Sequence, residues 1–418
     1  MEKWERELNH LVNASLPEQV DRRIHLTLDQ LKRTRKKSFG LRFGTTAAAA
    51  VLVLSFGLTA LSPAFAEAMK SIPVIGSVFE LVGDVGTKRG SQLNLTTNVG
   101  RQIQIDDYAM TITESLYDGS SISLGLIAPA DAKDPMGFVK DVTFSVDGKR
   151  LPSFSGGAST KILDDGTYAG TLSLHVDDPL PDVFTLGILS RDEAAIYAKI
   201  PVERKGENQL FAIAQTGTWN DVEVEYEDMA LYPTSTKLSF RLRGTDSPFW
   251  EFKVQDDQGR VLQPIGGHGG GTSDDKHYVY DFEPLETVPE SLTITPYLVG
   301  SDSTTRIDGE WKGTPITLSQ GKAGSVTVVD QKFEDDNLTL TYEVEGERLF
   351  EQANEIWLED EKGKPFDKGT PIRIQGRDHR YQLTFSNVRK TDSVFLSTPR
   401  FNAPVYLEEL AVVVDLEG

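Results

Sequence analysis

The distribution of hydrophobic and polar positions divides the chain into three parts. Residues 43–66 are uncharged and mostly apolar, and no other stretch of the sequence has this character. At about 1.5 Å per residue, a helix of this length crosses the roughly 30 Å hydrocarbon layer of a membrane. Residues 1–40 carry apolar residues at helical spacing, and from residue 93 onward apolar and polar residues alternate in short stretches. The pattern predicts one transmembrane helix between a short helical segment and a mainly β region.

Residues 1–42 are predicted to form a cytoplasmic helical segment. The sequence S-L-P-E at 15–18 fits a capping box, and one helical face follows it. The segment has a net charge of +4, and basic residues directly precede the apolar stretch, which places this end in the cytoplasm. The apolar face either packs locally or binds a cytoplasmic partner. Its residues, the candidate partner-binding set, are Val20, Ile24, Leu28 and Leu31.

Residues 67–92 are predicted to be a juxtamembrane interfacial segment. Ile75, Val78 and Phe79 share one helical face. This face would dock either on the membrane surface or on the first outer domain. Together with Arg42, these three residues are our candidate membrane-interface set. The A-F-A sequence at 64–66 also resembles a signal-peptidase site, so release of the outer part by cleavage stays open.

The β region repeats itself three times. Similar stretches begin at residues 102, 221 and 325, and each leads into a hairpin with a charged tip and then into an aromatic-rich strand. A unit of about 100–120 residues with about seven short strands has the size of a β-sandwich. We therefore expect tandem immunoglobulin-like β-sandwiches outside the membrane, at residues 93–204, 205–312 and 313–418.

Composition excludes several classes of function. The whole chain has a net charge of −20, so the part after residue 42 has a net charge of −24. Such an acidic surface argues against nucleic acid as a partner. The chain has no cysteine, which rules out disulfides and zinc sites with thiolate ligands.

No catalytic constellation emerges from the sequence. The six histidines show no zinc-ligand spacing, no serine lies in a nucleophile elbow, and the glycine-rich run at 266–271 lacks the lysine of a phosphate loop. His268 and His277 flank a flexible glycine-rich loop. Acidic turns could bind calcium weakly, although solvated turns are the default interpretation. We predict no enzyme activity, no metal and no cofactor.

The sequence I-P-V-I-G-S-V-F-E at 72–80, placed after the apolar span, carries a family resemblance. Residues 40–130 resemble a membrane-anchored family of unknown function found in spore-forming Gram-positive bacteria. Residues 205–300 are similar to a second uncharacterised, immunoglobulin-like family. The resemblance implies a link with extracytoplasmic-function sigma factors and an anti-sigma-like role. The absence of cysteine excludes the zinc-containing anti-sigma subtype, which uses a His-x3-Cys-x2-Cys motif.

Two functions are compatible with these observations. In the first, a single-pass membrane protein senses an unknown extracellular ligand or envelope stress, and its leader holds a cytoplasmic sigma factor. In the second, the outer part is a cell-surface binding or adhesion module, and the leader only anchors it in the bilayer. A sigma-factor gene next to the gene of this protein would favour the first function. Retention of function after exchange of residues 1–42 for an unrelated basic leader would favour the second.

Overall fold

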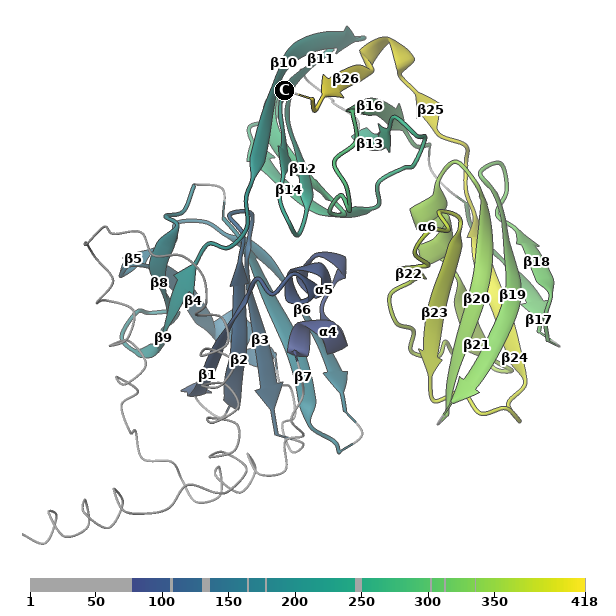
Figure 1. Ribbon diagram of the computed structural model, residues 1–418. Helices are drawn as coiled ribbons and strands as arrows, with labels where there is room; N and C mark the ends of the chain where they lie inside the picture. Colours follow the sequence, from purple (N-terminus) through teal and green to yellow (C-terminus); the bar gives the residue numbers. More distant parts are fainter. Residues whose placement is uncertain are drawn as a thin grey trace, which may run out of the picture. The chain divides into compact units, whose positions relative to one another are not determined.

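The computed structural model describes residues 77–417, apart from 106–107, 130–135, 164, 177–178, 245–249, 301–302, 312 and 335 (Figure 1). Within these residues the chain forms six antiparallel sheets. The sheets combine in pairs around three separate hydrophobic cores, which we call the first, middle and last modules. The mainly β character predicted from the alternating pattern is confirmed.

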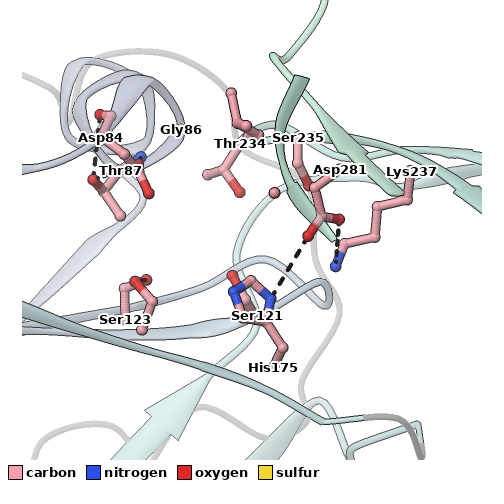
Figure 2. Close-up of a pocket in the computed structure, with 13 residues that line it drawn as sticks. Asp84, Gly86, Thr87, Ser121, Ser123, His175, Thr234, Ser235, Lys237 and Asp281 are labelled. Atoms are coloured by element: carbon pink, nitrogen blue, oxygen red, sulfur yellow. Dashed lines mark hydrogen bonds and ion pairs between the residues drawn. The ribbon is translucent and has the colours of Figure 1, made fainter. Parts of the chain in front are cut away.

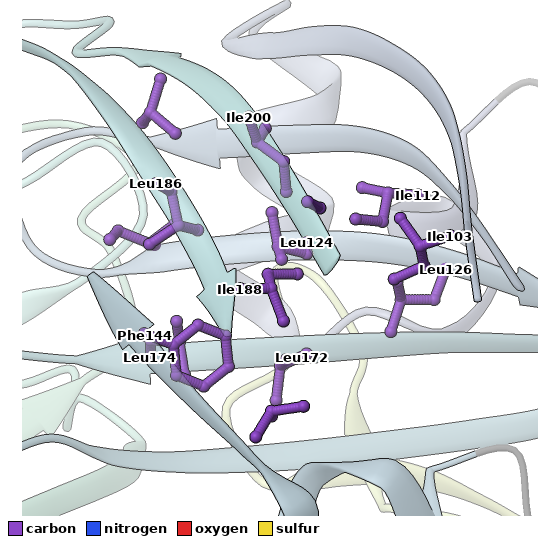
Figure 3. Close-up of a cluster of buried hydrophobic side chains, with 14 of the residues drawn as sticks. Ile103, Ile112, Leu124, Leu126, Phe144, Leu172, Leu174, Leu186, Ile188 and Ile200 are labelled. Carbon is purple, nitrogen blue, oxygen red and sulfur yellow. The ribbon is translucent and has the colours of Figure 1, made fainter. Parts of the chain in front are cut away.

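The first module comprises residues 96–203. One of its sheets has the spatial order β1 (Thr96–Ile105), β2 (Tyr108–Tyr117), β3 (Ile122–Ala128), β7 (Tyr168–His175), β6 (Ser155–Ile162). The other has the order β5 (Lys149–Arg150), β4 (Val142–Val146), β8 (Val183–Ser190), β9 (Ile196–Glu203), and the 3₁₀ turn η1 (Gly137–Asp141) precedes β4. Alternate residues of β9 are buried because successive side chains of a strand point to opposite faces. Both sheets contribute to the core, which includes Ile112, Leu124, Phe144, Leu172 and Leu186 (Figure 3).

Two short helices, α4 (Val78–Val82) and α5 (Val85–Gln92), precede β1. Helix α4 packs on β3, β6 and β7 of the first module. Its residue Val78 forms a small cluster with Ile127 and Ala169. These helices lead from the N-terminal part of the chain into the first module.

The middle module comprises residues 209–298 together with residues 405–416. Its first sheet has the order β10 (Gln209–Trp219), β11 (Val222–Leu231), β12 (Thr236–Arg243), β15 (Asp275–Phe282), β14 (Pro264–Gly271). In its second sheet, β16 (Ser291–Leu298) pairs with β13 (Trp250–Asp256), β25 (Val405–Tyr406) and β26 (Val412–Asp415). The 3₁₀ turn η2 (Glu408–Leu410) joins the last two strands. The end of the chain therefore completes the middle core.

The last module comprises residues 303–400. Its larger sheet has the order β18 (Ile316–Ser319), β19 (Gly324–Glu334), β20 (Asn337–Gly346), β23 (Arg380–Ser386), β22 (Ile372–Arg373). The smaller sheet has the order β17 (Ser303–Glu310), β24 (Val394–Arg400), β21 (Trp357–Asp360). Helix α6 (Leu349–Asn354) packs on β19 and β20.

The prediction of tandem immunoglobulin-like sandwiches is wrong in its arrangement. A tandem array needs units that are continuous in sequence, and the immunoglobulin pattern has seven strands in sheets of four and three. Here each module has one five-stranded sheet, and β25 and β26 return from the C-terminus to pair with β16. Strand β17, predicted within the second unit, pairs with β24 of the last module.

The prediction of a single-pass membrane protein is also corrected. Within the described residues no helix has the length and apolarity that a membrane crossing requires. The three α-helices there contain 5, 8 and 6 residues. The predicted span at 43–66 and the predicted cytoplasmic segment at 1–42 lie outside the described residues. The localisation with an extracellular C-terminal bulk finds no support in the described part of the chain, and we withdraw it.

Candidate functional site

Helix α5 lies against both the first and the middle module. A Cβ atom on Gly86 would stand 2.3 Å from the carbonyl oxygen of Thr234, and one on Gly90 would stand 2.1 Å from Cδ1 of Leu116. The two glycines, one helical turn apart, therefore permit an approach that a larger residue would block. From the same helix, Arg89 Nη2 donates to the carbonyl oxygen of Leu285 over 3.0 Å. The helix thus contacts both modules directly.

Asp118 joins the first module to the middle module at the end of β2. Its side chain is fully buried. Oδ2 accepts hydrogen bonds from the backbone N and the Oγ1 of Thr234, over 3.0 and 2.6 Å. Oδ1 accepts from the backbone N and the Oγ of Ser120, over 3.0 and 2.7 Å. Four hydrogen bonds satisfy the carboxylate, as a buried charge requires.

A polar cavity of about 70 Å³ lies beside these contacts. Figure 2 shows the imidazole of His175 and the ammonium of Lys237 directed at the carboxylate of Asp281. Lys237 Nζ lies 3.1 Å from Asp281 Oδ1, and His175 Nδ1 lies 3.9 Å from Asp281 Oδ2. His175 ends β7 of the first module, whereas Lys237 and Asp281 belong to β12 and β15 of the middle module. Hydroxyl groups complete the wall, from Thr87, Ser121, Ser123, Ser173, Thr234 and Ser235.

Three buried polar atoms of this cavity have no hydrogen-bond partner. They are Ser235 Oγ, His175 Nδ1 and Asp281 Oδ1, the last of which is in an ion pair with Lys237. Burial is the main cause that lowers the pKa of His175 below its ordinary value, and the nearby Lys237 acts in the same direction, while Asp281 opposes it. The contact between the first and middle modules, in the closed form seen here, therefore favours the neutral imidazole of His175. Such an arrangement can respond to a proton or hold small polar molecules, and it offers no nucleophile activated by a base.

The N-terminus of α4 is held by a buried carboxylate of β2. Glu114 Oε1 accepts from the backbone N of Val78 over 2.6 Å and from that of Phe79 over 3.3 Å. It also accepts from Ser77 Oγ over 2.9 Å. Backbone N–H groups at a helix start have no partner within the helix, so a carboxylate there satisfies them and complements the helix dipole. The first described residues of the chain are thus fixed to the first module.

A second set of charged contacts connects the middle and last modules. Glu283 forms ion pairs with Arg373 and with Arg260, the latter over 3.1 Å between Nη2 and Oε1. Glu283 and Arg373 are both buried, at 8% and 7% side-chain exposure. Nearby, Tyr297 donates from its hydroxyl to Glu351 Oε1 over 3.1 Å. Burial, with a smaller effect of Glu351, raises the pKa of Glu251 to about 7.

The predicted site residues fall into two groups. Val20, Ile24, Leu28 and Leu31, with Arg42 and Ile75, lie outside the described residues. Val78 and Phe79 are 2% and 0% exposed and pack within the first module. Their prediction as membrane-interface residues is wrong, whereas the alternative, docking on the first domain, is the arrangement found.

The histidines near the glycine-rich run lie on paired strands. His268 is on β14 and His277 is on β15, where His277 Nε2 lies 2.9 Å from Glu227 Oε2. Among the described residues, no group of three His, Asp or Glu side chains is placed to hold a metal ion. In two of the acidic turns, an aspartate side chain accepts a hydrogen bond from a backbone N–H group of the same turn. Asp256 Oδ1 accepts from the N of Arg260 over 2.8 Å, and Asp360 Oδ1 accepts from the N of Lys364 over 2.9 Å.

The residues at the contact between the first and middle modules, which we call the junction, were not predicted from the sequence. Asp118 and Gly119 carry an ordinary turn signal, and nothing local indicates that Asp118 binds Thr234, 116 positions away. The spacing of Gly86 and Gly90 is a signal for close helix packing that could have been noticed. The partner of Gly86 could not have been inferred, because Thr234 belongs to the middle module.

Two family models match parts of the chain. Residues 36–127 match a domain of unknown function, DUF4179, and residues 208–319 match a family of unknown function, DUF5643. Each match covers less than half of the chain. The predicted resemblance to two families of unknown function is confirmed at this level. No curated protein matches the chain.

Comparison with solved structures gives only distant similarity. A conserved domain protein from Bacillus anthracis is 16% identical, covers 54% of this chain and 82% of its own, and has a TM-score of 0.37. An I-band fragment of titin is 10% identical, covers 73% of this chain and 97% of its own, and has a TM-score of 0.12. At such scores neither likeness carries an argument about fold or function.

Proposed function

We propose that this protein is an anti-sigma-like regulator. Residues 1–42 would hold a sigma factor through Val20, Ile24, Leu28 and Leu31, and the β modules would sense a ligand or a stress. The resemblance of residues 72–80 implies the anti-sigma-like role, and the match to DUF4179 over residues 36–127 supports the assignment of this region to one family.

One structural observation carries the proposal. The helices that follow the N-terminal segment are held by two modules at once: α4 by Glu114 of the first, and α5 by Thr234 and Leu285 of the middle one. A change at the contact between these modules therefore alters the support of α5. The β region could therefore act on residues 1–42 through α4 and α5, which lie between those residues and the first module in the chain.

The proposal is tested by co-purification with the full chain as bait. We expect a sigma factor to be recovered, and the double substitution Ile24→Asp with Leu28→Asp to abolish recovery by placing charge on the apolar face. The matched control, Gln19→Asp with Gln30→Asp, adds the same charge away from that face and should retain binding.

Failure to recover any sigma factor with the intact chain would overturn the proposal. Equal loss in the variant and in its control would overturn the assigned binding face. Recovery of a polymer or a different protein, unaffected by exchange of residues 1–42, would instead indicate a binding or adhesion module.

A further inference from the structure

We propose that the stability of the contact between the first and middle modules depends on pH, and that protonation of His175 weakens this contact. Beside the hydrogen bonds of Asp118 to Thr234, this contact includes His175 on β7 and Asp281 and Lys237 on β15 and β12. The inference goes beyond the proposed function, because it concerns the β modules alone and does not require a sigma factor.

The geometry leaves His175 without a competent acceptor. Its Nδ1 lies 3.9 Å from Asp281 Oδ2, which is too long for a hydrogen bond. Asp281 is already paired with Lys237 over 3.1 Å, and the Asp281 side chain is only 6% exposed. A proton added to His175 would therefore place a second cation beside a single buried carboxylate.

Four charged or titratable groups face His175. Asp281 on β15 favours the protonated imidazole, and Asp84, the N-cap of α5, acts weakly in the same direction. Lys237 on β12 and His268 on β14 oppose protonation, and the ring of His268 lies 6.0 Å from that of His175. Burial is stronger than any of these four and also favours the neutral form.

The sign of the pH effect follows from linkage. The closed contact binds a proton on His175 less readily than the open state, where the pKa is close to its ordinary value of about 6.5. The contribution of neutral His175 to the stability of the closed contact is therefore fully present above about pH 6.5 and is lost as the pH falls below that value. For one proton, the ratio of closed to open molecules falls by at most about tenfold per pH unit. Opening would also remove Thr234 from its contact with Gly86 of α5.

Because the chain has no cysteine, it suits paired spin labels. Lys149→Cys in the first module and Gln258→Cys in the middle module introduce thiols at exposed positions. In the full chain, we expect the distance distribution between the labels to broaden between pH 7.5 and pH 5.0. Imidazole NMR should show His175 titrating below its ordinary pKa in the closed molecule.

Three substitutions separate His175 from other acid effects. His175→Gln should remove most of the change in label distance between pH 7.5 and pH 5.0. His277→Gln is the matched control, since His277 lies four residues from Asp281 on β15 and is paired with Glu227, and it should leave the change intact. Lys237→Met removes the cation that competes for Asp281, so the pKa of His175 should rise relative to that in the unmodified chain, and the change in label distance between pH 7.5 and pH 5.0 should become smaller.

An unchanged label distance in the unmodified chain between pH 7.5 and pH 5.0 would overturn the inference without reference to any variant. An equal response of His175→Gln and the unmodified chain would assign the opening to another group. Sigma-factor binding enters neither measurement, so failure here leaves the proposed function standing, and the converse also holds.

Discussion

Buried carboxylates make the decisive contacts at the scale of single residues. Glu114, Asp118, Asp281 and Glu283 are all less than 10% exposed, and each reaches a segment other than its own hairpin. A buried charge is costly unless it is paired or hydrogen-bonded, so each contact is sensitive to the position of its partner. These residues therefore fix which segments contact one another, and they also stabilise those contacts.

Glu251 supplies a prediction about pH at the joint between the middle and last modules. Its pKa is raised to about 7, mainly by burial and then by the charge of Glu351, so the folded state favours the protonated carboxyl. The associated stability is fully present below the ordinary pKa of 4.5 and is lost as the pH rises from there to about 7. We expect Glu251→Gln to melt at a higher temperature than the unmodified chain at pH 8 and to differ little at about pH 4, below the ordinary pKa of the carboxyl group.

Thermal unfolding of both proteins at the two pH values measures this effect. Glu290→Gln, which changes an exposed carboxylate of the same module, is the control and should follow the unmodified chain. A melting difference of equal size at about pH 4 and at pH 8 would contradict the assigned titration of Glu251.

At the scale of elements, α5 depends on the absence of two side chains. In an exposed helix, Gly→Ala stabilises by about 1 kcal/mol, because glycine has greater freedom in the unfolded chain. Gly86→Ala should do the opposite here, since its Cβ would lie 2.3 Å from the carbonyl oxygen of Thr234. We expect faster hydrogen exchange at the amides of Lys88 in α5 and of Leu93, which caps the helix at its C-terminal end.

Lys88→Ala is the control for this prediction, because it also introduces alanine into α5 without adding an atom toward Thr234. It should leave the exchange of α5 close to that of the unmodified chain. Slower exchange in Gly86→Ala would show that helix propensity outweighs the contact and that α5 is not tightly packed.

Local patterns predicted the elements better than their partners. The first of the three predicted hairpins with charged tips is present as β4 and β5, and in the turns of the other two Asp256 and Asp360 accept backbone hydrogen bonds. The helical face of Val78 and Phe79 was also correct. Its environment was not, because an apolar face is buried equally well by lipid or by protein, and the spacing of the residues does not distinguish the two.

At the scale of the whole molecule, the end of the chain returns to an earlier module. Strands β25 and β26 pair with β16, and Tyr226 donates from its hydroxyl to the carbonyl oxygen of Leu410 over 2.9 Å. The sequence repeats favoured three consecutive units. The return of β25 and β26 was not predicted, because strands of two and four residues carry too little pattern to indicate a partner more than a hundred residues away. The polar junction was unpredictable for the same reason: its residues meet only after the modules have formed.

This return yields a prediction with its control on the same strand. Val414 is 5% exposed in the middle core, whereas its neighbour Val413 is 59% exposed. Val414→Asp buries an unpaired charge and should destabilise the middle module by more than about 3 kcal/mol. Hydrogen exchange should accelerate in β16 and β11, with little change in β19 and β20 of the last module. Val413→Asp should leave all four strands protected, and loss of protection confined to the last module would contradict the assignment of β26.

The most direct test of the account concerns the link from the junction to α5. The measurement is amide hydrogen exchange at Lys88 and Leu93 in the full chain, compared between the unmodified protein and Asp118→Ala. Asp118 touches Thr234 and Ser120 and makes no hydrogen bond to α5, so an effect on α5 must pass through the contact between the modules. We expect faster exchange at both amides while β19 and β20 stay protected. Unchanged exchange in α5, with Thr234 released, would show that the modules do not control the helix that follows the N-terminal segment.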